Sequence, residues 1–120
     1  MSDHFIGLPQ AIEMTTRYRS KKETILDPAY RGKDILLLSE TFGREAFDAL
    51  LSEQDCTSIR IYFGMNENLQ VRAIIVGANS KNEDLLPQAG LMIPASTGSK
   101  IVEEGTPCPP ACPPPSPLNG

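Results

Sequence analysis

Four side chains in this sequence could bind a metal ion or exchange disulfides. They are the three cysteines and the only histidine, Cys56, Cys108, Cys112 and His4. Structural zinc is bound tetrahedrally by sets such as three cysteines and one histidine, with paired cysteines about two to four residues apart. The spacing of Cys108 and Cys112 permits such a site, but both chain ends and the middle would have to converge. We therefore expect no metal or other cofactor, and keep these four residues as the zinc candidates.

A disulfide between Cys108 and Cys112 is the other chemistry that this pair offers. Both lie in a proline-rich segment, where a polyproline II conformation would rise about 3.1 Å per residue and hold the two Cα atoms roughly 12 Å apart. A disulfide needs Cα atoms closer than about 7 Å. The pair can meet only where the chain bends, with Ala111 the favoured place, or where an X-Pro bond is cis. Because disulfides are rare in a reducing cytoplasm, we expect three unpaired thiols.

The proline-rich tail, residues 105–120, holds seven of the eleven prolines. It has few backbone donors and few large apolar side chains, so it cannot build a core of its own. Several of its prolines have the P-x-x-P spacing that docks in aromatic-lined grooves, although no basic residue follows Lys100. We expect the tail to dock on the protein's own surface or on a partner, through Pro110, Pro113 and Pro114.

The remaining residues favour neither catalysis nor nucleic-acid binding. The sequence contains no glycine-rich phosphate loop, no H-E-x-x-H and no G-x-S-x-G, so the prediction leans away from an enzyme. The net charge is −4, whereas a nucleic-acid-binding domain is normally basic. The apolar runs are too short to cross a membrane, and the N-terminus lacks the basic and apolar regions of a signal peptide. We predict a cytoplasmic protein that binds neither nucleic acid nor membrane.

Periodic apolar residues predict two helices and one hairpin. Pro9, favoured at a first helical position, begins an amphipathic helix over about 9–24, and a second helix over about 43–53 has Phe42 and Phe47 in the positions of a hydrophobic staple. The period then changes from 3.6 to 2, which predicts an antiparallel hairpin of 58–64 and 70–78. Segments 84–87, 91–93 and 100–103 are candidate edge strands.

These elements predict an α+β fold. Two N-terminal helices would pack on a small antiparallel sheet built around the central hairpin. We expect one domain over residues 1–104, followed by an extended Pro/Cys-rich tail over 105–120. Arg60 and Tyr62 alternate with the apolar residues of the first hairpin strand, and aromatic and arginine side chains are the usual anchors for a proline-rich segment. We therefore predict that these two side chains form the surface on which the tail or a partner docks.

Two segments resemble a known group of proteins. Arg60-Ile-Tyr-Phe-Gly-Met65, together with Cys108-Pro-Pro-Ala-Cys-Pro-Pro-Pro-Ser-Pro117, is similar to small bacterial proteins found chiefly in Bacteroidota. The similarity runs from the first helix through the tail. No activity is assigned to that group, so the resemblance implies a bacterial cytoplasmic setting and a tail that belongs with its domain, but no substrate.

The sequence as a whole favours an interaction or assembly module. Its tail would hold a homo-oligomer together, bind another protein, or pack on its own domain. The alternative is a thiol or metal protein, binding zinc or acting in redox chemistry, that uses Cys56, Cys108 and Cys112. Deleting 106–120 tests the first hypothesis, and replacing both tail cysteines with serine tests the second.

Overall fold

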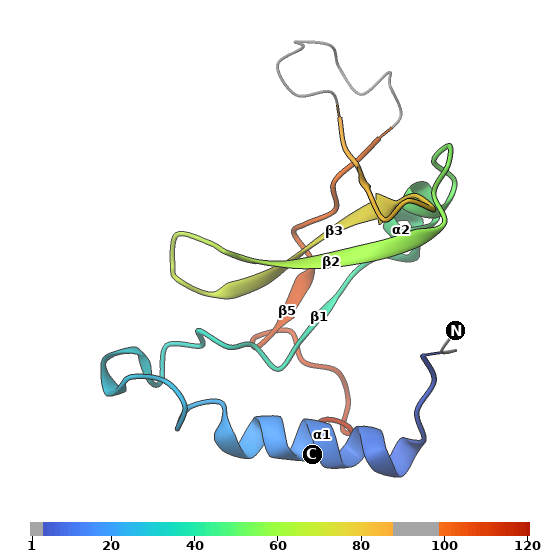
Figure 1. Ribbon diagram of the computed structural model, residues 1–120. Helices are drawn as coiled ribbons and strands as arrows, with labels where there is room; N and C mark the ends of the chain where they lie inside the picture. The colour runs from blue at the N-terminus through green and yellow to red at the C-terminus, as the bar shows by residue number, and fades with distance from the viewer. Residues whose placement is uncertain (1–3, 88–98) are drawn as a thin grey trace. The chain divides into compact units, whose positions relative to one another are not determined.

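Figure 1 shows the computed structural model of the chain, which describes residues 4–87 and 99–120. Contacts within the chain group it into two units. Unit 1 comprises residues 1–39 and 107–120, and unit 2 comprises residues 40–106. The predicted boundary, a domain over 1–104 and a tail over 105–120, stays a prediction.

Unit 1 contains one α-helix and a short 3-10 helix. Helix α1 spans Leu8–Lys21 and has a proline in its first turn, as the sequence predicts. It ends three residues before the predicted position 24, because the following residues form turns. The 3-10 helix spans Pro28–Tyr30 and is capped by Asp27, whose carboxylate accepts a hydrogen bond from the amide of Ala29 at 2.9 Å.

Unit 2 is built on the predicted hairpin. Strand β2, Ser58–Met65, pairs antiparallel with β3, Val71–Ala78, over eight residue pairs without interruption. Strand β4, Asp84–Leu85, adds to the other edge of β3, at the start of the predicted segment 84–87. Of segment 100–103, Val102 makes a single bridge to Ile75. Segment 91–93 lies outside the described residues.

Helix α2, Arg44–Leu51, packs against β2 and β3 in unit 2. Gly43 is its N-cap, and the rings of Phe42 and Phe47 lie 6.1 Å apart, so the predicted hydrophobic staple is confirmed. Leu50, Ile75 and Val76 have the largest fully buried side chains of the described residues. The helix therefore lies where its apolar stripe can cover the sheet.

A second, two-stranded sheet joins segments far apart in the sequence. Strand β1, Ser39–Thr41, pairs with β5, Thr106–Cys108. The sequence predicts neither strand, because three residues are too few to show a period. The chain is thus of mixed α and β structure, with two α-helices and small antiparallel sheets in the described residues. That both helices cover the larger sheet stays a prediction.

No helix within residues 4–87 and 99–120 has the length and apolar character required to cross a membrane.

Candidate functional site

The tail cysteines form a disulfide, so the expectation of three unpaired thiols is wrong. Cys108 and Cys112 are bonded, with their Cα atoms 4.5 Å apart. The amide of Ala111 donates to the carbonyl of Pro107 at 3.0 Å, which makes a tight turn between the two cysteines. Two cis peptide bonds, Cys108–Pro109 and Pro109–Pro110, lie inside the loop. The assumption of an extended polyproline II conformation therefore fails at this segment.

Two backbone carbonyls of the tail accept hydrogen bonds from other parts of unit 1. Cys108 is 2% exposed, and its carbonyl accepts from the amide of Leu38 at 2.8 Å. Near the C-terminus, the guanidinium of Arg19 on α1 donates to the carbonyl of Leu118 at 2.6 Å. Between these two anchors Pro109 is half-buried, and the other prolines are exposed, namely Pro110, Pro113, Pro114, Pro115 and Pro117.

Helix α1 also binds the segment that precedes Leu38. The hydroxyl of Tyr18 donates to the carbonyl of Leu37 at 2.6 Å, and the ammonium of Lys22 donates to the carbonyl of Leu36 at 3.1 Å. Burial, with a contribution from the negative charge of Glu23, raises the pKa of Tyr18. Residues 36–38 thus have α1 and the tail as their hydrogen-bond partners within unit 1.

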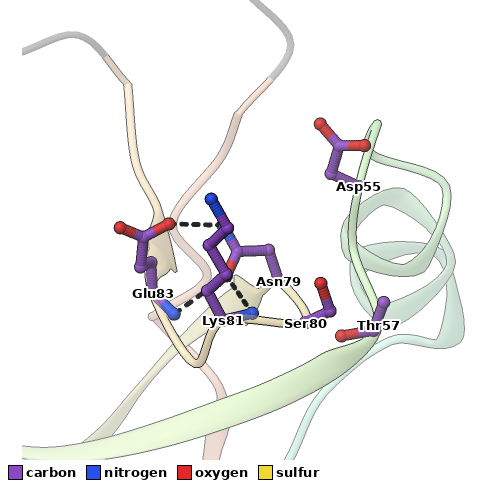
Figure 2. A pocket seen from close by; sticks show the side chains of 6 residues that line it. All are labelled: Asp55, Thr57, Asn79, Ser80, Lys81 and Glu83. Atoms are coloured by element: carbon purple, nitrogen blue, oxygen red, sulfur yellow. Dashed lines mark hydrogen bonds between the residues drawn. The ribbon is translucent and has the colours of Figure 1, made fainter.

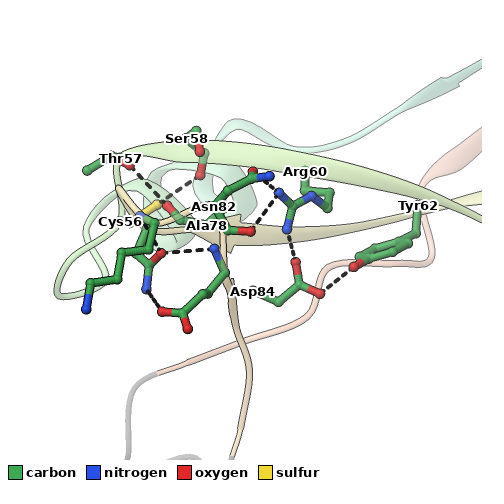
Figure 3. Close-up of polar contacts among 11 residues, drawn as sticks. Cys56, Thr57, Ser58, Arg60, Tyr62, Ala78, Asn82 and Asp84 are labelled. Atoms are coloured by element: carbon green, nitrogen blue, oxygen red, sulfur yellow. Dashed lines mark hydrogen bonds and ion pairs between the residues drawn. The ribbon is translucent and has the colours of Figure 1, made fainter.

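The predicted docking residues, Arg60 and Tyr62, share one carboxylate in unit 2 (Figure 3). The guanidinium of Arg60 forms an ion pair with Asp84 and donates to the backbone carbonyl and the side-chain oxygen of Asn82. The hydroxyl of Tyr62 donates to the other oxygen of Asp84. These bonds, from Tyr62 first and then from Arg60, lower the pKa of Asp84. Their role in docking the tail stays a prediction.

Cys56 is the free cysteine of the described residues. Its thiol donates to the carbonyl of Ser58 at 3.3 Å (Figure 3), and it packs so close to Gly77 that a Cβ atom there would lie 2.9 Å from its sulfur. Cys56 belongs to unit 2, whereas His4 and the tail cysteines belong to unit 1. Residues 4–87 and 99–120 contain no cluster of three or more His, Cys, Asp or Glu side chains able to hold a metal ion.

A polar hollow of about 330 Å³ lies beside the loop after β3 (Figure 2). It is lined by Asp55, Thr57, Asn79, Ser80, Lys81 and Glu83. The side chain of Asn79 donates to Glu83 at 3.0 Å and accepts from the amides of Lys81 and Glu83. The side chain of Asn79 therefore stabilises the loop that carries it. We assign no ligand to this hollow.

An ion pair between Glu40 and Arg72 is a polar contact that the sequence does not predict. The two side chains are 10% and 15% exposed, and Arg72 Nε lies 2.9 Å from Glu40 Oε2. Arg72 also donates to the carbonyl of Gly105 at 2.8 Å, while the other oxygen of Glu40 accepts from the amide of Ala73. Thirty-two positions separate the pair, and no local pattern signals so distant a contact.

Comparisons with protein-family models, with curated proteins and with solved structures find no match for this chain.

Proposed function

We propose that this chain is a protein-interaction module that anchors its proline-rich tail on its own unit 1 and presents the exposed prolines to a partner protein. The observation that carries the proposal is the contrast within the tail itself. Cys108 and Leu118 are bound to unit 1, and Pro110, Pro113 and Pro114 between them are exposed. A segment held at both ends loses less conformational entropy on binding than a free tail does.

The chemistry of the tail defines the kind of partner. Proline has no backbone N–H, so the segment can offer carbonyl acceptors and rigid pyrrolidine rings but few donors. Such ligands dock in shallow grooves lined by aromatic side chains. The partner would therefore present tyrosine or tryptophan side chains that donate hydrogen bonds to the tail carbonyls.

Deletion of residues 106–120 tests whether the tail belongs to the fold of unit 1. We expect a lower melting temperature, because Leu38 loses its acceptor and the buried Cys108 is removed. A melting curve and an elution volume that both match the full chain would contradict the proposal.

A photo-crosslinking amino acid tests whether the tail binds a partner. Placed at Ala111 and activated in cells that produce the full chain, it should give a discrete product that disappears when Pro113 and Pro114 are replaced by alanine. The matched control carries the same probe at Asn68, in the exposed turn between β2 and β3. The same products from both positions would contradict recognition by the tail.

The disulfide favours a second candidate function, thiol–disulfide exchange. Cys112 is exposed and Cys108 is buried, so an external dithiol would attack the sulfur of Cys112 and release Cys108 as the leaving thiolate. The second thiol of the reductant would then displace Cys112, so that the reductant is oxidised as both cysteines are reduced. Alkylation mass spectrometry of the native protein in dithiothreitol buffers tests this. A disulfide that persists until the protein unfolds would contradict it.

The second candidate function includes zinc binding by Cys56, Cys108 and Cys112. Zinc could bind the two tail cysteines only after their disulfide is reduced. Native mass spectrometry of reduced protein mixed with zinc chloride tests it. The Cys108→Ser/Cys112→Ser double variant is the control. Equal zinc uptake by both proteins would contradict a site at the tail.

A further inference from the structure

The backbone N–H and C=O groups of successive residues of β3 point alternately to the two edges of the strand. The amide of Ala73 donates to Glu40 at 2.8 Å, and the amide and carbonyl of Ile75 exchange hydrogen bonds with Val102 at 2.8 Å. Gly77 lies opposite Leu85 of β4. The odd-numbered residues of β3 therefore face away from β2, and the even-numbered ones face β2.

This alternation determines which groups of β2 remain unpaired. The register places even-numbered residues opposite even-numbered ones, as in Arg60 opposite Val76, so the even-numbered residues of β2 exchange the hydrogen bonds with β3. The N–H and C=O groups of Ile59, Ile61 and Phe63 then point to the opposite side. Among the residues that the structure describes, no strand pairs with this outer edge of β2.

The outer edge of β2 lacks the usual protection against pairing with another chain. Proteins block such edges with lysine, proline or a β-bulge. The strand Ser-Ile-Arg-Ile-Tyr-Phe-Gly-Met contains neither lysine nor proline, and its register has no bulge. Ile61, Phe63 and Met65 are also 52%, 82% and 59% exposed. They share one face of the strand. Figure 1 shows that the end of the hairpin that carries the turn extends beyond α2.

We infer that this edge binds the same edge of a second copy of the chain, as an antiparallel β2–β2 pair about a two-fold axis. The pairing of the one charged side chain of β2 makes this edge compatible with a second copy of itself. Arg60 is the one charged residue of β2, and Asp84 neutralises it, so two copies can approach without like-charge repulsion.

The register follows from the same alternation. With Ile61 opposite its own counterpart, the outward groups of Ile59, Ile61 and Phe63 meet outward groups and form symmetric hydrogen bonds. Apolar side chains then lie opposite apolar ones, with Ile59 opposite Phe63 of the second copy. Arg60 lies opposite Tyr62 of the second copy, while its guanidinium stays paired with Asp84 on β4. A pairing shifted to centre on Tyr62 would instead place Arg60 opposite Gly64, which has no side chain to pack against.

The proline-rich tail cannot occupy this edge. Strand addition requires alternating N–H donors and C=O acceptors, and seven of the last sixteen residues lack the N–H. The inference therefore rests on β2 alone and not on the proposed role of the tail. Because one strand buries less than the about 800 Å² per partner of a stable complex, we expect a weak, concentration-dependent dimer.

Sedimentation equilibrium of the full chain, from about 10 μM to about 1 mM, tests the inference. The chain should pass from monomer to dimer. Ile61→Lys, which places two ammonium groups opposite each other, and Phe63→Lys should each raise the dissociation constant at least tenfold. Both side chains are more than half exposed, and circular dichroism checks that the variants stay folded. Leu69→Lys, at a 44% exposed position in the turn, is the matched control and should dimerise like the parent.

Crosslinking tests the register. Ile61→Cys should give a covalent dimer under mild oxidation, because facing residues of a hydrogen-bonded pair have Cα atoms about 5.5 Å apart. Asn68→Cys, off the strand, should not. A chain that stays monomeric at every concentration, a dimer indifferent to both lysine variants, or equal crosslinking at positions 61 and 68 would overturn the inference. If the chain bound an unrelated β-strand peptide but did not dimerise, the edge would be a binding site for another protein.

Discussion

The two units of this chain are stabilised in different ways. In unit 2 an uninterrupted ladder of eight residue pairs and helix α2 come with the largest fully buried side chains, those of Leu50, Ile75 and Val76. In unit 1 helix α1 has no buried residue, and the buried side chains are those of Ile35, Leu37 and Cys108. The contacts that hold the tail are separate ones, namely the disulfide and single hydrogen bonds at Cys108 and Leu118.

This difference predicts which part of the chain should unfold cooperatively. A packed core distributes its free energy over many contacts, so its parts unfold together, whereas a segment held by a few anchors can open locally. We therefore expect unit 2 to unfold as a whole and the tail to be released one anchor at a time. The four variants below test that contrast, from the largest expected effect to the smallest.

Leu50→Ala should produce the largest loss. Leu50 is fully buried, and removing such a side chain costs about 3 kcal/mol in free energy of unfolding, part of it from the cavity left behind. Chemical denaturation followed by circular dichroism measures the change. Leu51→Ala, at a 55% exposed neighbour, is the control and should cost less than about 0.5 kcal/mol. Equal losses would show that α2 does not form the centre of unit 2.

The hairpin and both helices could be predicted from the sequence because their signals are local. Alternation over 58–64, the β-branched apolar run over 70–78, a proline at position 9 and the Phe42–Phe47 pair each depend on residues close in sequence. The observed β2, β3, α1 and α2 agree with them to within a few residues.

The rest depends on contacts between distant residues. No residue near Glu40 indicates a contact with Arg72, which lies thirty-two positions later. Strands β1 and β5 have three residues each, too few to show a period. The tail disulfide differs from the prediction for another reason. The sequence permits Cys108 and Cys112 to meet where the chain bends, but the prediction of free thiols rests on a reducing cytoplasm, and no local pattern shows that the chain makes this turn.

Cys112→Ser should release the tail while leaving unit 2 folded. Opening the short loop between the two cysteines costs about 2 kcal/mol by loop-closure entropy, and the loss should fall on unit 1. Hydrogen exchange at the amide of Leu38, which donates to Cys108, should become faster, while exchange at Ile75 stays unchanged. Cys56→Ser removes a thiol that has no disulfide and should leave the Leu38 amide protected. Faster exchange at both amides would contradict the contrast between the units.

The disulfide also bears on the predicted cytoplasmic location. Disulfides persist mainly in oxidising compartments, and those of the cytosol are usually transient and catalytic or redox-sensing. A cytoplasmic protein would therefore hold Cys108 and Cys112 partly reduced. The location stays a prediction, and the redox state of the tail in cells would test it.

Glu40→Gln should destabilise unit 2 by about 1 kcal/mol, because glutamine has only one acceptor oxygen. If that oxygen keeps the hydrogen bond from the amide of Ala73, an NH2 group faces Arg72, whose Nε loses its acceptor. Denaturant unfolding measures the loss. Glu104→Gln, at an exposed position, is the control. A loss that vanishes in high salt would show that this pair behaves as an exposed one, despite its 10% and 15% exposure.

The smallest effect should come from acid titration of the Arg60–Asp84–Tyr62 cluster. Hydrogen bonds from Tyr62 and Arg60 lower the pKa of Asp84 from its ordinary value of 3.8, so the folded state holds this proton less tightly than the unfolded chain does. The contribution to stability is therefore fully present above pH 3.8 and is lost as the pH falls through the lower folded value. Because the cluster lies at the surface, with Arg60 and Asp84 partly exposed and Tyr62 exposed, water screens its charges and we expect only a small difference in stability.

Comparing the parent chain with Asp84→Asn at pH 6 and near pH 3 isolates this contribution. The parent should be the more stable at pH 6, and the gap should narrow in acid, while Glu67→Gln, exposed in the turn between β2 and β3, should show no such trend. A gap that stays constant would mean that the carboxylate charge contributes nothing, and that Arg60 is held by Asn82 alone. The neutralisation of Arg60 by Asp84 also underlies the proposed β2–β2 pairing. We therefore expect the dissociation constant of the dimer to rise as Asp84 is protonated. The Leu69→Lys control should show the same rise, which would connect the titration of Asp84 to dimerisation.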